Sequence, residues 1–344
     1  MTSPSPSPSP SPSPSPSPSP SPSPSPTYRI ELTPPDISSY EAGNTGTPYV
    51  TTFDSGKPGP HVLVQALTHG NELCGAIALD YLFREGVRPV AGRLTFIFAN
   101  IEAFASWDTS NPNRSRYVDE DFNRVWSDET LKGTRSSTEL RRARELLKFV
   151  DAADFVLDIH SMSEPCAPIM VCGATGQGGE KSAAFARKMR VPQNLLIDTG
   201  HPAGLRMIER GPFGDPHAPQ TALLIECGQH WERSSVDVAI DTTLRFLQTT
   251  GVVDTAFVEP RLRIQPTAQT TINVTEAVVA KSLSFRFAGT VTGLQVIAKA
   301  GDPIAYDGDE VIVAPYDQTV LVMPSLAHLK VGTTMVRLGR ATPG

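Results

Sequence analysis

The chain has 344 residues, an apolar fraction of 39% and a formal net charge of −6, with no run of lysine or arginine. This balance argues against a nucleic-acid groove or a polybasic membrane patch, because both depend on clustered positive charge. No apolar stretch approaches the ~18 residues of a membrane span, and the N-terminus lacks the basic start and apolar middle of a signal peptide. We therefore expect a cytoplasmic protein that binds neither nucleic acid nor membranes.

The first segment, from Ser3 to Pro26, is a Ser-Pro repeat. It has no side chain that can build a core, and proline at every second position removes half of its backbone donors. We expect residues 1–26 to be a disordered tail, extended in the polyproline manner at ~3 Å per residue.

Residues 27–259 show the strand–helix alternation that is typical of an α/β domain. Ser136 and Glu139 have the spacing of a capping box at the start of one helix. Buried strands are predicted at 61–67, 93–99, 155–159 and 222–225, and helices at 73–83, 136–150 and 234–249. This order predicts an α/β fold with an open, largely parallel mixed sheet that has helices on both faces.

The pattern changes after about residue 260. Short β-rich runs are separated by Gly, Pro and Asp, and helical periodicity is weak. The runs lie at 271–274, 283–287, 311–313, 319–323 and 334–338. We therefore predict a small β domain over residues 260–344.

Acidic and imidazole side chains follow the predicted strands. His69 and Glu72 lie in the turn after the first strand, where Gly70 allows a sharp bend, His160 ends the third strand and Glu226 follows a later one. The carboxyl ends of strands in an open α/β sheet collect ligands, so these side chains could converge. Two imidazoles and one carboxylate form a recognised ligand set for catalytic zinc, with a fourth position open to water.

Five segments carry a resemblance to a known family. They are 66–72 (ALTHGNE), 100–103 (NIEA), 116–124 (RYVDEDFNR), 158–160 (DIH) and 225–226 (IE). In this order they resemble the succinylglutamate desuccinylase/aspartoacylase family of zinc hydrolases, which have a zinc carboxypeptidase-like fold. The match covers about residues 61–228, and loosely the β-rich part after them, and HGNE and RYVDEDFNR together are the specific pair.

The resemblance implies roles for individual residues. His69, Glu72 and His160 match the ligands of one zinc ion. Glu226 matches the general base, and Arg116 matches the arginine that polarises the scissile carbonyl. Solvated surface charge is the alternative for Arg116 and Arg124, which lie among Asp119, Glu120 and Asp121.

Two more residues match the part of the family motif that binds the substrate. Asn123 and Arg124 match the pair that holds the α-carboxylate of the substrate. A guanidinium fork suits a planar carboxylate, and an amide adds a neutral donor. Asp158, two residues before His160, is either a partner of that imidazole or the polar end of its strand.

The sequence departs from the family in the residues that set substrate preference. Members that act on N-acyl-aspartate use a further arginine before the base and a tyrosine from the β domain. Arg206 and Arg210 precede Glu226 without a matching context, and neither Tyr306 nor Tyr316 can be assigned. The sequence therefore does not identify the acyl group or the amino acid of the substrate.

The resemblance implies zinc-dependent hydrolysis of the amide bond of an N-acyl amino acid, a small-molecule substrate. One alternative is a carboxypeptidase-type amidase that acts on a longer substrate. Another is a non-catalytic zinc-binding protein, in which Cys166 or Cys172 would complete a closed site. With Cys74 and Cys227, these cysteines form no CxxC pair, so reduced and mostly buried thiols are expected. The oligomeric state is not predicted.

Overall fold

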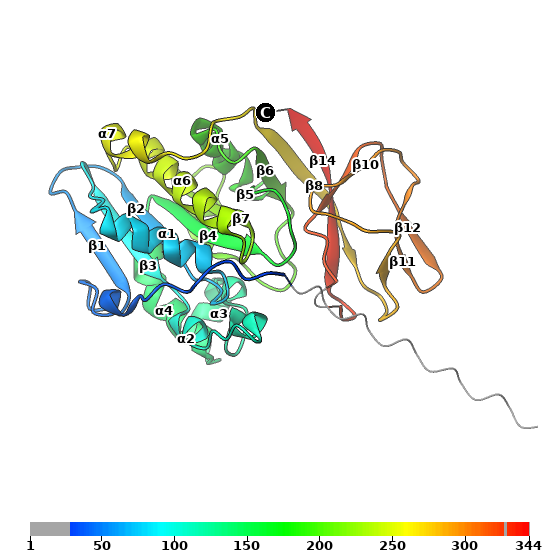
Figure 1. Ribbon diagram of the computed structural model, residues 1–344, viewed down its shortest axis with the longest axis horizontal. Helices are drawn as coiled ribbons and strands as arrows, with labels where there is room; N and C mark the ends of the chain where they lie inside the picture. Colours follow the sequence, from blue (N-terminus) through cyan, green and yellow to red (C-terminus); the bar gives the residue numbers. More distant parts are fainter. Residues whose placement is uncertain (1–27, 327–328, 344) are drawn as a thin grey trace, which may run out of the picture.

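The computed structural model describes residues 28–326 and 329–343. The Ser-Pro segment predicted to be a disordered tail lies outside these residues. Within them, one sheet of eleven strands runs through the molecule in the order β1-β3-β2-β4-β7-β5-β6-β8-β14-β13-β10 (Figure 1). The strands are β1 (Val50–Asp54), β2 (His61–Ala66), β3 (Arg93–Phe98), β4 (Phe155–Met162), β5 (Ile169–Ala174), β6 (Asn194–Asp198), β7 (Thr221–Gln229), β8 (Thr270–Val279), β10 (Val296–Ile297), β13 (Thr319–Val322) and β14 (Thr334–Pro343).

The helices cover both faces of this sheet, which confirms the predicted α/β fold. On one face lie α1 (Leu73–Arg84), α5 (Gly179–Met189), α6 (Arg233–Thr249) and α7 (Thr255–Val258). On the other face lie α2 (Ile101–Ala105), α3 (Asp128–Lys132) and α4 (Thr138–Asp151). The strands β1, β5 and β6 and the helix α5 were not predicted. β1 pairs only with β3 at the edge of the sheet, so its residues stay partly exposed and its sequence is polar.

The strands that carry the polar side chains are longer than predicted. β4 and β7 run parallel, and β5 pairs antiparallel with the far side of β7. Because β7 has partners on both sides up to Glu226, this residue lies within the strand rather than after it, directly opposite His160. β4 likewise continues two residues beyond His160 to Met162.

Successive side chains of β7 point alternately into two hydrophobic cores on opposite faces of the sheet. Leu223 and Ile225 point to the core beneath α1, α5 and α6, whereas Ala222 and Leu224 point to the core beneath α4. A strand side-chain period of two places Glu226 on the same face as Leu224. The candidate site therefore lies on the α4 face of the sheet.

The C-terminal β portion is joined to the main sheet. β8 pairs parallel with β6, and β14 pairs antiparallel with β8. Among the described residues, a second sheet holds β9 (Arg286–Phe287), β11 (Pro303–Asp307) and β12 (Glu310–Val313). It packs on β8, β13 and β14 through its own apolar cluster, which includes Phe287, Ile304 and Leu338. Each predicted run contains or overlaps a strand, β10 and β11 were missed, and the domain boundary at residue 260 stays a prediction.

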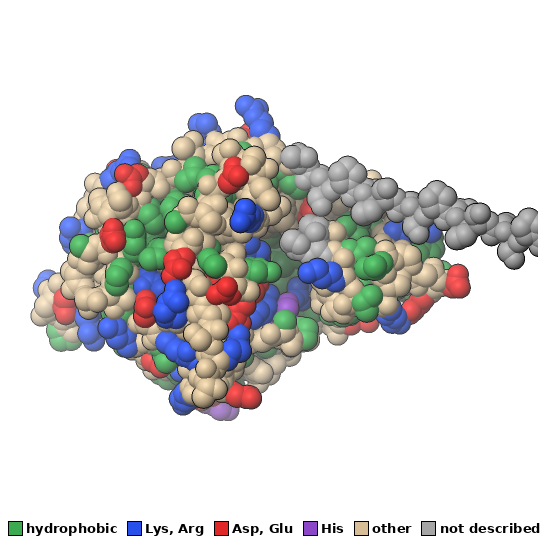
Figure 2. Space-filling model, turned by 90° about the horizontal axis from the view of Figure 1, so that it is seen from below, with side chains coloured by type: hydrophobic (Ala, Val, Ile, Leu, Met, Phe, Trp, Pro, Cys, Tyr) green, Lys and Arg blue, Asp and Glu red, His purple; other side chains and the backbone are tan. Residues whose placement is uncertain are grey.

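The surface between these two portions is hollowed. Figure 2 shows a depression there, with histidine and basic side chains around it. No helix among the described residues is long and apolar enough to cross a membrane.

Candidate active site

The turn between β2 and α1 carries His69 and Glu72. Gly70 is needed in this turn because of close packing: a Cβ atom there would lie 2.4 Å from the backbone nitrogen of Phe104 and 2.4 Å from the carbonyl oxygen of Ser115. The left-handed residue in this stretch is Leu67, with φ 61°. The turn is therefore held against the segments that follow β3, and the glycine in it is required by close packing rather than by a left-handed backbone conformation.

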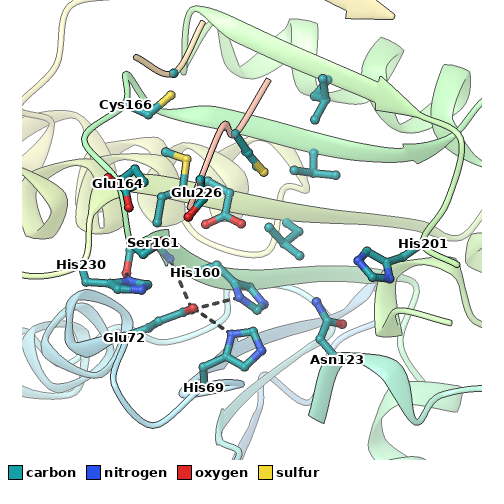
Figure 3. Close-up of a pocket in the computed structure, with 18 of the residues that line it drawn as sticks. His69, Glu72, Asn123, His160, Ser161, Glu164, Cys166, His201, Glu226 and His230 are labelled. Carbon is teal, nitrogen blue, oxygen red and sulfur yellow. Dashed lines mark hydrogen bonds and ion pairs between the residues drawn. The ribbon is translucent and has the colours of Figure 1, made fainter. Parts of the chain in front are cut away.

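His69, Glu72 and His160 form a buried cluster (Figure 3). His69 Nδ1 lies 2.8 Å from Glu72 Oε1, and His160 Nδ1 lies 2.9 Å from Glu72 Oε2. One potential ligand atom from each residue lies within 4.8 Å of the others. The structure thus brings the three predicted ligands together, with the same nitrogen of each imidazole facing the same carboxylate.

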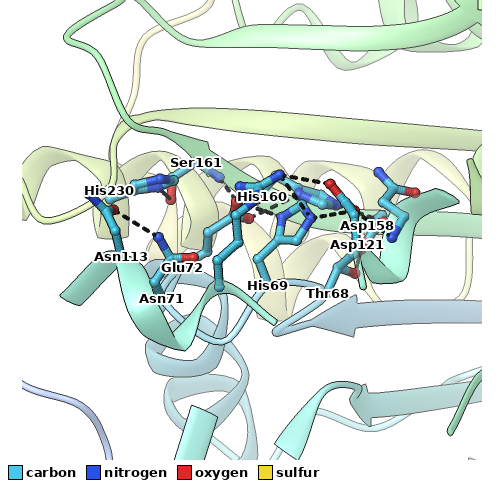
Figure 4. A network of polar contacts seen from close by, with 12 residues as sticks. Thr68, His69, Asn71, Glu72, Asn113, Asp121, Asp158, His160, Ser161 and His230 are labelled. Atoms are coloured by element: carbon cyan, nitrogen blue, oxygen red, sulfur yellow. Dashed lines mark hydrogen bonds and ion pairs between the residues drawn. The ribbon is translucent and has the colours of Figure 1, made fainter. Parts of the chain in front are cut away.

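The outer nitrogen of each imidazole contacts a second carboxylate (Figure 4). His160 Nε2 lies 2.8 Å from Asp158 Oδ2, and His69 Nε2 lies 3.0 Å from Asp121 Oδ1. The hydroxyl of Thr68 donates to the other oxygen of Asp158 at 2.7 Å. Carboxylates in these positions fix the tautomer and orientation of histidines that bind a metal, so the residues present fit a zinc ion. Asp158 is therefore a partner of the imidazole.

Neighbouring charges shift the pKa values of Glu72 and His160 within the cluster. Burial alone would raise the pKa of Glu72, but the adjacent His69 and His160 outweigh burial and hold this pKa well below its usual range. Burial would lower the pKa of His160, yet Asp158 and Glu72 raise it well above the ordinary value. The Glu72 carboxylate and the His160 imidazole therefore stabilise each other's charged forms.

Glu226 lies beside this cluster but is not part of it. Its side chain lines the same cavity, and its Oε2 atom is buried with no hydrogen-bond partner among the described residues. Burial raises the pKa of Glu226 to about 8, and the nearby Glu72 adds to this, although His160 and Arg116 act in the opposite direction. A buried carboxylate without a partner and with a pKa close to neutral is suited to proton transfer.

Arg116 points into the site. It ends the short 3-10 helix η2 (Pro112–Arg116), and its guanidinium lies 3.4 Å from Glu72 Oε1 and 3.3 Å from Asp121 Oδ2. Its Nη2 atom also lies 3.0 Å from His69 Nε2. These contacts argue against solvated surface charge, the alternative considered for this arginine.

Asn123 and Arg124 line the cavity from the 3-10 helix η3 (Phe122–Arg124). Asn123 Oδ1 accepts a hydrogen bond from the backbone nitrogen of Met207 at 3.3 Å, which leaves the amide nitrogen as a free donor group. Arg124 donates to the carbonyl oxygen of Asn123 at 2.7 Å. Burial lowers the pKa of Arg124 to about 10, with nearby Arg116 and Arg206 adding to this effect.

Glu139 has a role that sequence reasoning missed. Ser137, rather than Ser136, caps α4 by accepting from the backbone nitrogen of Leu140, so the predicted capping box is wrong. The fully buried Glu139 carboxylate instead accepts backbone hydrogen bonds from Val118 at 2.7 Å, from Asp119 at 3.0 Å and from Glu120 at 3.2 Å. It also accepts from the Asn100 side chain at 3.0 Å. Glu139 thus fixes the conformation of the loop between Arg116 and Asp121. An acidic residue on the apolar face of a predicted helix was the sequence feature that could have indicated this role.

The cavity runs from the His–Glu–His cluster across the face of the sheet. Its volume is about 190 Å³. Leu224, Val171 and Leu196 lie side by side on β7, β5 and β6 and form an apolar floor next to Glu226. In Figure 3, Asn123 lies toward one end, whereas Cys166 lies toward another.

The sequence left two arginines and two tyrosines without an assigned role in substrate preference. One of the arginines lines the cavity. Arg206 lines it and pairs with Asp198 through two hydrogen bonds of 2.7 and 2.8 Å. Arg210 is buried and instead pairs with Asp151 at the end of α4 and with Asp128 at the start of α3. Neither tyrosine lines the cavity: Tyr306 stacks under Arg286, and Tyr316 stacks under Arg340. Arg337 of β14 also lines the cavity and was not considered.

Comparison with known families identifies the chain. Residues 58–247 match the succinylglutamate desuccinylase/aspartoacylase catalytic domain, and the protein belongs to this family of hydrolases that act on N-acyl amino acids. The resemblance drawn from the five motifs is thereby confirmed. A comparison with curated proteins finds no significant match.

Solved structures share the fold at low sequence identity. The succinylglutamate desuccinylase of Vibrio cholerae has a TM-score of 0.62 and 16% identity, over 86% of this chain and 86% of its own. A succinylglutamate desuccinylase/aspartoacylase of Rhodobacter sphaeroides has a TM-score of 0.61 and 16% identity, over 86% and 89%. The product-bound ectoine utilization protein EutE (DoeB) of Ruegeria pomeroyi has a TM-score of 0.60 and 14% identity, over 86% and 92%.

Proposed function

We propose that the protein is a zinc-dependent hydrolase that cleaves the amide bond of an N-acyl amino acid. One observation carries this proposal: the buried His69–Glu72–His160 cluster lies in the same cavity as Glu226, whose Oε2 atom has no hydrogen-bond partner among the described residues. A structural metal site has no use for an unpaired carboxylate, whereas amide hydrolysis needs a proton acceptor close to the attacking water.

His69, Glu72 and His160 would hold the zinc ion, with the two imidazoles binding through Nδ1. When bound there, zinc supplies Lewis-acid polarisation of the attacking water and of the scissile carbonyl. Asp121 and Asp158 keep the outer nitrogens occupied, so both imidazoles present the same edge to the ion.

Side chains of the protein carry out the proton transfers and stabilise the charge that develops on the substrate. Glu226 accepts a proton from the water that attacks the amide carbon and then delivers this proton to the leaving nitrogen, so that a free carboxylate and an amine are formed. Arg116 donates a hydrogen bond to the carbonyl oxygen as negative charge develops on it. Its contacts with Glu72 and Asp121 keep the guanidinium in place before the substrate arrives.

The substrate is anchored through its α-carboxylate. Arg124 and the free amide group of Asn123 face the cavity from one short helix, and both can donate to a planar carboxylate. This anchoring would put the scissile bond between the pair and the cluster, and it fits a substrate that ends in the free carboxylate of an amino acid.

The number of potential ligands in the His69–Glu72–His160 cluster favours a catalytic zinc site, in which one coordination position is left for water. Among the described residues, it contains three potential ligands, and neither Cys166 nor Cys172 belongs to it. Cys172 points into the core beneath α5, while Cys166 lies in the cavity outside the cluster. A closed four-ligand zinc site is therefore not favoured.

The proposal is tested by measuring zinc content and turnover together. Purified protein should contain one zinc ion per chain and hydrolyse at least one member of a panel of N-acyl amino acids. His160→Ala should lose both zinc and activity, because two remaining ligands bind the ion poorly. The exposed His217 offers a matched control, since His217→Ala removes an imidazole that does not line the cavity. Full zinc and activity in His160→Ala would refute the assignment.

A further inference from the structure

Basic side chains gather toward one end of the cavity. Arg124, Arg206 and Arg337 line the cavity, as does His201. Their closeness is reflected in the pKa of His201, which burial and the charges of these three arginines lower to about 3. Figure 3 shows His201 at the same end of the cavity as Asn123. This is the end at which the α-carboxylate of the substrate is proposed to bind.

The opposite end of the cavity carries an acidic side chain instead. Glu164 lies in the segment between β4 and β5 and lines the cavity. Figure 3 shows Glu164 and Cys166 on one side of Glu226, with Asn123 on the other. Within residues 28–326 and 329–343, no lysine or arginine forms an ion pair with Glu164. Its carboxylate therefore has no balancing charge from the part of the protein that the structure describes.

The imidazole at this end of the cavity does not supply that charge either. Figure 3 shows His230 on the same side of Glu226 as Glu164, and its Nδ1 atom lies 2.8 Å from Ser161 Oγ. Burial lowers the pKa of His230 to about 3, although Glu72 acts in the opposite direction. The imidazole is therefore neutral near pH 7, so a cation that meets Glu164 has to come from a ligand.

Tyr28 holds the Glu164 carboxylate in position. Its hydroxyl donates a hydrogen bond to Glu164 Oε2. Burial and this carboxylate raise the pKa of Tyr28, so the phenol stays protonated and remains a donor. Tyr28 is fixed in turn by packing against an apolar cluster of Leu32, Leu73 and Trp231. The hydrogen bond engages one oxygen of the carboxylate, so a ligand can contact the other without reorganising the side chain.

We propose that Glu164 is a specificity-determining residue that binds a protonated amino group on the acyl part of the substrate. This inference rests on the proposed function, in which Asn123 and Arg124 anchor the α-carboxylate at the opposite end. A substrate with an anion at one end and a cation at the other matches the charges at both ends of the cavity. The substrate class is therefore an aminoacyl amino acid, and the addition of one water across its amide bond releases two amino acids.

Three isosteric pairs of acyl groups test this inference on the zinc-loaded enzyme. The charged members are glycyl, β-alanyl and 4-aminobutyryl, and the neutral members of the same lengths are propionyl, butyryl and pentanoyl. Each is joined to L-alanine, L-glutamate and L-lysine, so that the preference for the amino acid does not decide the result. For at least one chain length, wild-type kcat/KM should favour the charged member by at least about tenfold, the usual worth of a charged hydrogen bond.

Glu164→Gln keeps the shape of the side chain and an acceptor for Tyr28 but removes the charge, so the ratio of kcat/KM between charged and neutral members should fall close to one. Tyr28→Phe should reduce this ratio mainly through KM, because the carboxylate loses the hydrogen bond that positions it. Glu129→Gln is the matched control, since Glu129 is exposed on α3 and does not line the cavity. The inference is overturned if no pair favours the charged member, or if the preference survives in Glu164→Gln, which would leave Glu164 with a structural role.

A binding measurement separates this inference from the proposed function. Calorimetric titration of Glu226→Gln with the same pairs measures the preference without turnover, and adding Glu164→Gln should abolish it. Selective binding of the charged members without hydrolysis of any substrate by the wild type would refute the hydrolase and support the role of Glu164. Hydrolysis of N-acyl amino acids with no selectivity in binding would do the opposite.

Discussion

Glu226 and His160 are direct neighbours across the parallel strands β4 and β7. Both side chains therefore leave the same face of the sheet, one carrying a buried oxygen without a hydrogen-bond partner among the described residues and the other facing Glu72. This pairing places the Glu226 carboxylate, the proposed proton acceptor, next to the candidate metal ligands but outside the group that they form.

Glu226→Gln keeps the shape of this side chain but cannot accept a proton. We expect kcat to fall by at least ~10²-fold, the usual contribution of a general base, with zinc content and melting temperature retained. Measuring all three on one preparation separates the possible roles. A loss of zinc would make Glu226 a ligand, and normal turnover would contradict the mechanism.

Arg124→Met should weaken substrate recognition. Losing the charged fork to the α-carboxylate should cost on the order of 2–4 kcal/mol in kcat/KM. An N-acyl amino-acid amide lacks that carboxylate and should lose little further rate on the variant. The exposed Arg114 provides the control Arg114→Met. Equal losses on acid and amide would assign Arg124 to structure.

Asp158→Asn should weaken metal binding without removing a ligand. The neutral amide can still accept from His160 Nε2, but it no longer makes the imidazole more basic. We expect zinc affinity to fall by ~10- to 100-fold, as measured by competition with a chelator. Unchanged affinity would make Asp158 merely the polar end of its strand.

Glu139→Gln should disturb the loop that carries Asp121. The amide group would set a donor against backbone donors of residues 118–120, so a stability loss of ~1–3 kcal/mol is expected. Well below the melting temperature, kcat/KM should still fall, because Arg116 and Asp121 would be displaced. Glu145→Gln, on an exposed part of the same helix, should leave kcat/KM unchanged. A folded Glu139→Gln protein with full activity would refute the positioning role.

The thiol of Cys166 should react slowly although it lies in the cavity. Burial, with the charge of Glu226 adding to it, raises the pKa of this thiol to about 12. At pH 8 only ~10⁻⁴ of it is therefore the reactive thiolate, and this fraction rises with pH. Iodoacetamide should label native protein far more slowly than unfolded protein at pH 8. Rapid labelling of Cys166 in the native state would show that the site is more open or more positive than described.

Much of the site follows from local patterns in the sequence. A buried strand followed by His69 and Glu72, and later strands that carry His160 and Glu226, bring four side chains into one cavity. Hydrophobic periodicity predicted these strands, since it records which residues are buried. The motifs then indicated the family.

Other features were decided by tertiary structure alone. The contacts of Glu139 with residues 118–120, of Asp121 with His69, and of Arg337 with the cavity join segments that no local pattern relates. Arg337 lines the cavity because β8 and β14 continue the same sheet beyond β6. Sequence periodicity specifies which side of a strand is buried, but strand order and register determine which distant side chains meet there.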